Sequence, residues 1–200
     1  MITIIDYGAG NILSVVNALK YIGQTPTLSG DPDVIAKADK LILPGVGAFG
    51  ECMKRLRDSG LDESIKESVK KGAPIMGICL GLQLFFDYSE EFGHTDGLGF
   101  ICGGVKKINA GALKLPHIAW TSVDVNPASR LFKGVNSGEF FYFVHSYCAK
   151  ATNPADESAT AVYGEKFTVA VEKDNVFGTQ FHPEKSGAVG LKLLENFVKV

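Results

Sequence analysis

Cysteine is scarce in this chain, and no two cysteines stand close together. Among 200 residues there are only four, Cys52, Cys79, Cys102 and Cys148, and none forms a CxxC pair. Scattered cysteines exclude the disulfide framework of small secreted proteins, and they offer no zinc or thiol-exchange motif. We therefore expect reduced thiols and no metal site.

Long apolar runs and blocks of like charge are missing as well. No stretch of about 18 apolar residues occurs, and the opening residues 1–6 lack the basic region and apolar segment of a signal peptide. Lys and Arg (20) nearly balance Asp and Glu (22), which leaves a formal net charge of -2. Electrostatics therefore predict neither a nucleic-acid partner nor membrane binding, and we expect a cytoplasmic protein.

Hydrophobic residues make up 46% of the chain, which is enough for a sizeable core. No linker, repeat or low-complexity segment divides the sequence. We therefore expect residues 1–200 to form a single domain.

Apolar runs alternate with helical periodicity as far as residue 86. Strands are expected at 2–5, at 24–29, at 40–43 and between Pro74 and Cys79, and helices at 11–21, from 31, at 48–58 and at 61–71. This alternation predicts an α/β fold with a central, mostly parallel sheet flanked by helices. Between about 101 and 178, short apolar stretches broken by Gly, Asn and Pro predict additional antiparallel strands. A last helix follows, with an apolar face that carries Val189, Leu193, Leu194 and Phe197.

Cys79 stands between two glycines, in the pattern Gly77-Ile78-Cys79-Leu80-Gly81, where a buried strand is expected to end and a helix to begin. This spacing is typical of a nucleophile elbow, a tight strand-to-helix turn that only small neighbours permit. At a helix N-terminus the unpaired N–H groups and the helix dipole favour a thiolate over a thiol. The alternative is a buried core cysteine, a common environment for this residue.

Two glycine-rich turns follow earlier strands. Gly8-Ala9-Gly10-Asn11 lacks the third glycine of a dinucleotide fingerprint and the Lys-Ser/Thr of a phosphate-binding loop, so a simple strand–helix turn is favoured and no cofactor is expected. Asn11 either caps the following helix or makes a surface contact. The loop 44–50 contains three glycines, and it is either an ordinary flexible loop or a segment that turns N–H groups toward a neighbouring site. Asp6, this loop and Cys79 all follow strands, whose carboxyl ends share one edge of a parallel sheet.

His182 and Glu184 lie two residues apart, just before the last helix. Because Pro183 disfavours helical backbone at His182, we expect an extended segment in which both side chains project to one side. The carboxylate can then orient the imidazole, and the imidazole can act as a base toward a distant thiol. The alternatives are a satisfied core histidine and a solvated carboxylate. The remaining histidines are expected to be structural or peripheral: His94, His117 and His145.

Together, the segments Gly77–Gln83 and Gln180–Glu184 resemble the two signatures of class I (triad) glutamine amidotransferases. Further motifs resemble, from end to end, the glutaminase subunits of imidazole glycerol phosphate synthases: Asp6-Tyr7-Gly8-x-Gly10-Asn11, Pro44-Gly45-Val46-Gly47-x-Phe49-Gly50, Pro116-His117-x-x-Trp120, Tyr142-Phe143-Val144-His145-Ser146-Tyr147 and His182-Pro183-Glu184-Lys185-Ser186. Related subunits for anthranilate or aminodeoxychorismate usually carry Pro in place of Val46. One departure is Ala119-Trp120-Thr121, where the resembled subunits commonly have Gly-Trp-Asn.

The resemblance implies a flavodoxin-like class I glutamine amidotransferase domain with Cys79, His182 and Glu184 as its triad. It also implies that glutamine and the reaction's oxyanion are held by Val46, Gly47, Leu80, Gln83, Glu91, Ser146 and Tyr147. The ammonia would be used in a separate chain, a (β/α)8-barrel cyclase subunit that forms a heterodimer with this one. Candidates for the face that meets the cyclase are Asn11, Trp120 and Lys185, whose alternative roles are a helix cap, a core aromatic and a solvated charge.

Three other functions stay open at this point. The chain could be the glutaminase subunit of another synthase, such as anthranilate synthase. A stand-alone γ-glutamyl hydrolase would need no partner. A relative that only binds its ligand would show no thiol-dependent activity, although all three triad residues are present here.

Overall fold

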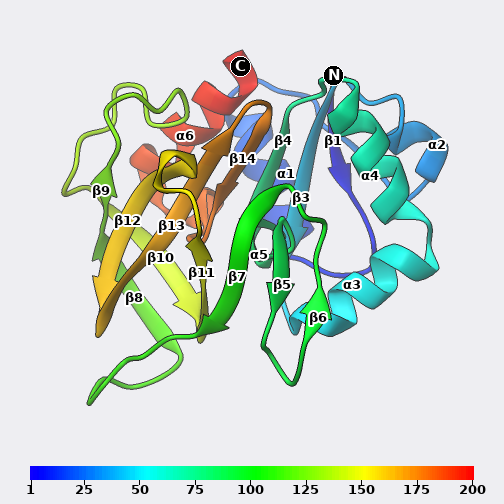
Figure 1. The fold of residues 1–200 in the computed structure, drawn as a ribbon. Helices are drawn as coiled ribbons and strands as arrows, with labels where there is room; N and C mark the ends of the chain where they lie inside the picture. Colours follow the sequence, from blue (N-terminus) through cyan, green and yellow to red (C-terminus); the bar gives the residue numbers. More distant parts are fainter.

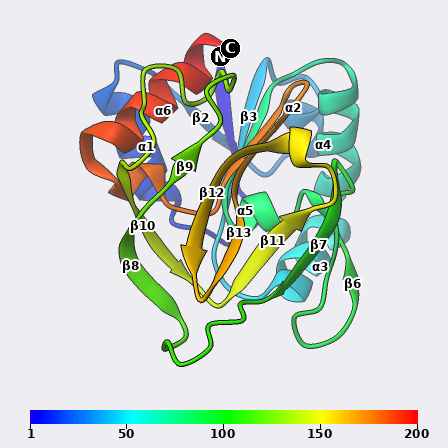
Figure 2. The ribbon, with the colours of Figure 1, turned by 60° about the vertical axis from the view of Figure 1, so that its left-hand side comes forward.

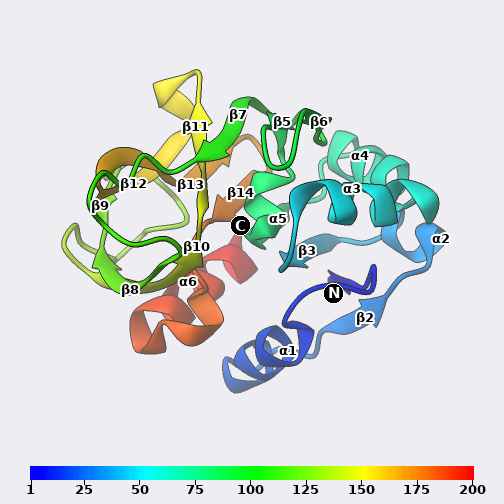
Figure 3. The same cartoon turned by 90° about the horizontal axis from the view of Figure 1, so that it is seen from below.

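A computed structural model describes residues 1–200 and shows a layered α/β fold (Figure 1). Five strands of its main sheet run parallel, in the order β2-β1-β3-β4-β14. Their bounds are β1 (Ile2–Ile5), β2 (Thr27–Ser29), β3 (Lys40–Gly45), β4 (Ile75–Cys79) and β14 (Val176–Thr179). The carboxyl ends of these strands share the lower edge of the sheet in Figure 1, and Figure 3 views that edge from below.

Helices cover both faces of the parallel strands. The helices α1 (Ile12–Tyr21) and α6 (Gly187–Lys199) lie on one face, and α2 (Pro32–Ile35), α3 (Phe49–Asp58) and α4 (Leu61–Lys70) lie on the other (Figure 3). Alternate strand residues join different cores, so that Ile4 packs in the cluster under α1 and α6, and Ile5 in the cluster under α3 and α4. Burial on both faces explains why β1, β3 and β4 are nearly continuous apolar runs.

The second half of the chain extends the sheet mainly through antiparallel pairs. After β14 the order continues through β13, β11, β7, β5 and β6, and only β5 and β7 pair in parallel. The bounds are β5 (Phe86–Ser89), β6 (Thr95–Asp96), β7 (Ile101–Lys107), β9 (Asp124–Val125), β11 (Tyr147–Ala151), β12 (Glu157–Tyr163) and β13 (Glu165–Lys173). Two further strands, β8 (His117–Ser122) and β10 (Phe140–His145), form a separate antiparallel pair beside β12 and below α6 in Figure 2.

The predicted fold class is confirmed, with differences at element boundaries. The second strand begins at Thr27 instead of Gln24, because Pro26 has no N–H group to donate to a neighbouring strand. The third strand continues to Gly45, which pairs with Cys79. The helix after Cys79, α5 (Leu80–Gln83), is a single turn because the chain enters β5 three residues later.

None of the helices combines the length and the apolar character that crossing a bilayer requires. No three His, Cys, Asp or Glu side chains are grouped to hold a metal ion.

Candidate active site

Cys79 ends β4 in a backbone conformation that non-glycine residues rarely adopt. Its φ is 57° and its ψ is -110°, and α5 begins at the next residue. The neighbouring glycines are required by close backbone contacts. A Cβ at Gly77 would lie 2.5 Å from the Gly81 carbonyl, and one at Gly81 would lie 1.9 Å from the Leu43 carbonyl oxygen. The predicted tight turn is therefore present, and its strain is held in place by the surrounding sheet.

A pocket of about 310 Å³ opens over this turn, at the carboxyl edge of the sheet. Cys79, His182 and all seven residues that the resemblance assigns to glutamine and the oxyanion line it. The full lining is Val46, Gly47, Cys79, Leu80, Gln83, Glu91, Pro116, Val144, His145, Ser146, Tyr147 and His182. Its size suits a small polar molecule. Sequence reasoning missed Pro116, Val144 and His145 as lining residues, although the quoted motifs contain all three.

His182 and Glu184 form a buried pair at the pocket wall. The imidazole Nδ1 lies 2.8 Å from Glu184 Oε1, and the two side chains are 3% and 1% exposed. The backbone is extended only at His182, because Pro183–Lys185 forms a 3₁₀ turn. The expectation of a fully extended segment was therefore wrong, yet the turn still brings the carboxylate to the imidazole.

The charge state of His182 follows from this environment. Burial lowers the pKa of His182, but the Cys79 sulfur and the Glu184 carboxylate together more than offset that effect and raise the pKa to about 9. The Nε2 atom is buried and makes no hydrogen bond in this resting arrangement. The raised pKa keeps this imidazole protonated at neutral pH, beside the Cys79 sulfur.

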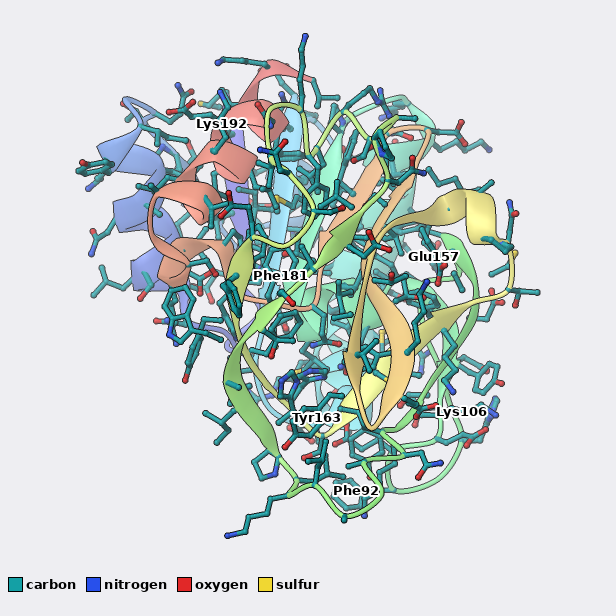
Figure 4. All side chains as sticks on the ribbon, turned by 90° about the vertical axis from the view of Figure 1, so that its left-hand side faces the viewer. Phe92, Lys106, Glu157, Tyr163, Phe181 and Lys192 are labelled. Carbon is teal, nitrogen blue, oxygen red and sulfur yellow. The ribbon has the colours of Figure 1, made fainter.

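Phe181 anchors the segment that carries His182. It is fully buried, in the space between the β8–β10 pair and the main sheet (Figure 4), and it stacks on Phe141 of β10 with ring centroids 4.1 Å apart. The adjacent backbone is also tied to β10, since the His182 N–H donates to the Tyr142 carbonyl at 3.0 Å. The imidazole is thus held by the inner face of the β8–β10 pair.

His145 and His117 form a second histidine pair next to the pocket. His145 Nδ1 donates to the Tyr147 carbonyl at 2.8 Å, so its Nε2 accepts from His117 Nδ1 at 3.0 Å. His117 Nε2 in turn accepts from the Thr121 hydroxyl at 2.8 Å. Burial lowers the pKa of both imidazoles, that of His145 to about 4. Both rings are therefore neutral, and Tyr163, labelled in Figure 4, stacks on His117 at 4.0 Å.

His94 pairs with a carboxylate two residues away, Asp96, at 3.1 Å. Both are exposed and neither lines the pocket, so the peripheral position expected for His94 holds. His145 is not peripheral, because it lies in the pocket wall, and its hydrogen bonds to Tyr147 and His117 fit the structural alternative.

Two side chains that line the pocket, Glu91 and Gln83, are held by hydrogen bonds. Glu91 Oε2 accepts from the Phe49 N–H, at the start of α3, at 2.7 Å. Gln83 Nε2 donates to the Tyr147 carbonyl at 3.0 Å and to Gln180 Oε1 at 2.8 Å. These two bonds use both hydrogens of Gln83 Nε2. Its Oε1 is then the polar atom left for a ligand.

The glycine-rich loop after β3 forms another wall. Gly47 has a φ of +106°, and a Cβ built there meets no atom within 4 Å. Upstream, the Tyr7 hydroxyl donates to the Pro44 carbonyl at 3.0 Å and fixes the start of the loop. Val46 is 45% exposed at the pocket mouth. The loop is therefore fixed at its base and open at its tip.

The three predicted interface residues lie outside the pocket. Trp120 is 53% exposed on β8, which excludes the core position that was its alternative. Lys185 is exposed, with its Nζ 5.9 Å from the ring centre of Tyr142. Asn11 stands at the N-cap of α1, but its side chain caps no backbone N–H, and its Oδ1 accepts from the Ser14 hydroxyl at 3.0 Å.

Comparison with known proteins places this site in a family. A model of the class I glutamine amidotransferases matches residues 3–200. The chain therefore belongs to the class I glutamine amidotransferase family. Over its full length it is similar to subunits named imidazole glycerol phosphate synthase subunit HisH. These include the proteins of Syntrophotalea carbinolica (48% identity, 98% of both chains), Campylobacter jejuni (48%, 100% of both) and Chlorobaculum tepidum (44%, 100% of both).

Solved structures show the same fold. A crystal structure of a glutamine amidotransferase superposes with a TM-score of 0.76 at 18% identity, and covers 99% of this chain and 97% of its own. The structure of PurLQS from Thermotoga maritima gives a TM-score of 0.77 at 21% identity, with the same coverage.

Proposed function

We propose that this chain is the glutaminase subunit of an imidazole glycerol phosphate synthase. It hydrolyses glutamine to glutamate and ammonia. The ammonia passes to a cyclase subunit, which makes imidazole glycerol phosphate and aminoimidazole carboxamide ribonucleotide in histidine biosynthesis. The observation that carries the proposal is one pocket lined by an elbow cysteine, Cys79, and by His182, which is paired with Glu184. The full-length similarity to HisH subunits supports this choice of synthase, and a cytoplasmic single-domain protein remains our expectation.

The nucleophile in this mechanism is the Cys79 thiolate. It attacks the side-chain amide carbon of glutamine and forms a tetrahedral intermediate. With a pKa of about 9, His182 is protonated at pH 7, and its free Nε2–H protonates the departing nitrogen. Ammonia leaves, and a glutamyl thioester remains on Cys79. The neutral imidazole then takes a proton from water, which attacks the thioester and releases glutamate.

Two backbone N–H groups stabilise the negative oxygen of the intermediate. One belongs to Leu80, the first residue of α5, where an N–H has no partner within the helix. The other comes from the Val46–Gly47 segment, which the left-handed backbone at Gly47 lets turn toward Cys79. Loss of one such donor slows comparable reactions by about 10²- to 10³-fold.

The remaining pocket residues hold the α-amino acid end of glutamine. Glu91 pairs with the α-ammonium, since its Oε2 is fixed by the Phe49 N–H and its other oxygen is left for the ligand. Gln83 offers its Oε1, and the backbone of Ser146 and Tyr147 lines the pocket beside it. The Tyr147 carbonyl already accepts two hydrogen bonds, so it shapes the wall and does not itself bind the ligand.

The outer side of the β8–β10 pair is the surface that meets the cyclase. We call it the docking face, and it consists of three cross-strand pairs: Ile118 with Val144, Trp120 with Tyr142, and Ser122 with Phe140. Outward positions of an antiparallel pair are usually polar, but here five of the six are apolar or aromatic. Ile118 and Phe140 are 58% and 55% exposed. A continuous exposed apolar surface of this kind marks a protein interface.

The docking face adjoins the pocket, which suits transfer of ammonia to a partner. Val144 belongs to both surfaces. The Ser186 hydroxyl donates to the His182 carbonyl at 2.6 Å and accepts from the Tyr142 N–H at 3.0 Å, so the strand at the interface also holds the histidine. The partner is a (β/α)8-barrel cyclase subunit in a heterodimer, and Asn11 and Lys185 contact it beside the docking face. The loop 44–50 controls the glutaminase activity. It turns the N–H of its Val46–Gly47 segment toward the oxyanion when the cyclase has bound its nucleotide ligand.

The test is glutamate release from glutamine, by this chain alone and with a cyclase subunit and its nucleotide ligand. We expect strong stimulation by the loaded cyclase, and loss of activity to background in Cys79→Ala. Cys102→Ser, at an exposed cysteine, is the matched control and keeps full activity. Activity that survives in Cys79→Ala contradicts the mechanism. Equal activity without any partner points to a stand-alone γ-glutamyl hydrolase, and stimulation only by another synthase subunit points to that synthase.

A further inference from the structure

Gln180 is a buried amide that the mechanism above does not use. It follows β14 directly, two residues before His182, and none of its surface is exposed. Its Nε2 donates to the Cys79 sulfur at 3.7 Å, and its Oε1 accepts from Gln83 Nε2 at 2.8 Å. A polar group buried this deeply destabilises a protein unless it is hydrogen-bonded. Here the partner of its N–H group is the sulfur that attacks the substrate.

A backbone carbonyl sets the direction of these hydrogen bonds. The Tyr147 carbonyl can only accept, so Gln83 must present its Nε2 to it, at 3.0 Å. The second hydrogen of this Nε2 goes to Gln180, which must therefore present its Oε1. That leaves one orientation for the Gln180 amide, with its N–H group aimed at Cys79. The Tyr147 carbonyl thus fixes a donor at the sulfur through two glutamine side chains.

We propose that Gln180 is a positioning residue of the reaction centre, which stabilises the Cys79 thiolate by donating a hydrogen bond to its sulfur. This inference rests on the proposed role of Cys79 as the nucleophile. A charged sulfur accepts a hydrogen bond far more strongly than a neutral thiol, so the donor favours the thiolate. The same bond stabilises the sulfur as the leaving group when water cleaves the thioester. His182 Nε2 makes no hydrogen bond in the resting pocket, and it stays free for the substrate.

The test is the rate at which iodoacetamide alkylates Cys79, followed by mass spectrometry of the Cys79 peptide across a pH series. Iodoacetamide needs no glutamine site, so the rate reports the thiolate itself. Gln180→Glu keeps the oxygen that accepts from Gln83. It replaces the Nε2 donor that faces Cys79 by the second oxygen of a carboxylate. We expect alkylation at pH 7 to slow by about tenfold or more, and to recover at higher pH. Gln180→Met, which removes the donor without adding charge, shows a smaller change in the same direction.

Controls separate this effect from a general loss of structure. Gln24→Glu makes the same chemical change away from the pocket, and Cys79 alkylation is expected to match the wild type. Exposed Cys102 reports on the reagent in every sample, and its rate is the same in all variants. Unchanged Cys79 alkylation in folded Gln180→Glu and Gln180→Met overturns the proposal.

A second measurement needs no Gln180 variant to fold. The chain has only three glutamines, so the side-chain amide resonances of Gln180 can be followed by NMR in the wild type. We expect its Nε2 hydrogens to shift with pH in step with Cys79 alkylation, and this shift to be absent in Cys79→Ala. If the resonances of the Gln180 Nε2 hydrogens shift with pH in the same way in Cys79→Ala, Gln180 does not donate to the Cys79 sulfur.

The experiments distinguish a failure of the proposed function from a failure of the proposed role of Gln180. If the wild type releases no glutamate with a loaded cyclase, and Cys79 alkylation still depends on Gln180, the proposed function is wrong and the hydrogen bond stands. The opposite outcome is that glutamate release depends on Cys79 and on the cyclase while the rate of Cys79 alkylation is the same in the Gln180 variants. In that case the proposed function stands and the proposed role of Gln180 is wrong.

Discussion

Gly81 shows how tightly single residues are constrained around Cys79, the proposed nucleophile. A methyl group in Gly81→Ala would lie 1.9 Å from the Leu43 carbonyl oxygen, so β3 and α5 must move apart. We expect the free energy of unfolding to fall by about 3 kcal/mol. Gly72→Ala is the matched control, because Gly72 has a φ of +99° but open space around it. Backbone strain alone predicts a loss of roughly 1–2 kcal/mol there. Urea unfolding measures both, and equal losses would contradict the steric argument.

Single residues also show which parts of the site a sequence can reveal. Cys79 and His182 stand out as candidates because glycine spacing and a neighbouring carboxylate are local signals. Gln180 and His145 carry no such signal, although both stand inside recognisable motifs. Their roles depend on the Tyr147 carbonyl, which lies far from Gln180 in sequence and meets it only through Gln83. A hydrogen-bond network across strands cannot be obtained from spacing along one of them.

Among the elements, the β8–β10 pair makes the clearest prediction about binding. Trp120 is exposed at the centre of the docking face, opposite Tyr142, and large central aromatics carry much of the binding energy at interfaces. In Trp120→Ala we expect the dissociation constant for the cyclase to rise by about tenfold or more. Stability is little changed, because the side chain is half exposed.

Calorimetric titration with the cyclase measures this affinity. Tyr21→Ala is the matched control, because Tyr21 is 81% exposed at the end of α1, away from the docking face, and its loss leaves the affinity unchanged. If Trp120→Ala binds as tightly as Tyr21→Ala, the docking face is assigned to the wrong surface.

Element types were easier to predict than element ends. The strands β1, β3 and β4 are buried almost throughout, so each appears in the sequence as an apolar run, and all three were expected. The helix after Cys79 looks open-ended in the sequence because Leu82, Leu84 and Phe85 are all apolar. Its length is set by tertiary contacts, since β5 must turn back to pair with β7. The 3₁₀ turn after His182 is likewise set by contacts with β10, through Ser186.

At the scale of the whole molecule, two histidines shift stability in opposite directions with pH. The pKa of His145 is lowered to about 4 from 6.5, so its contribution is present above pH 6.5 and is lost as the pH falls toward 4. The pKa of His182 is raised to about 9, so its contribution is present below pH 6.5 and is lost as the pH rises through 9. Together they predict greatest stability near pH 6.5.

Urea unfolding at intervals from pH 4 to 10 checks this profile. His145→Gln is expected to flatten the acid side, where the wild type loses on the order of 3 kcal/mol. His94→Gln, at an exposed histidine, leaves the acid side as it is. An acid side that is equally steep in His145→Gln would show that other groups govern it.

The place of β14 in the sheet has a consequence for how the molecule is made. This strand is the last of the chain, yet it lies between β4 and β13 and joins the parallel half of the sheet to the antiparallel half. During synthesis, one edge of β4 therefore stays unpaired until nearly all residues have left the ribosome. Gln180 and His182 follow β14 within three residues, so they reach Cys79 only in the final moments of synthesis. In a nascent or truncated chain, the proposed nucleophile would therefore lack both Gln180 and His182.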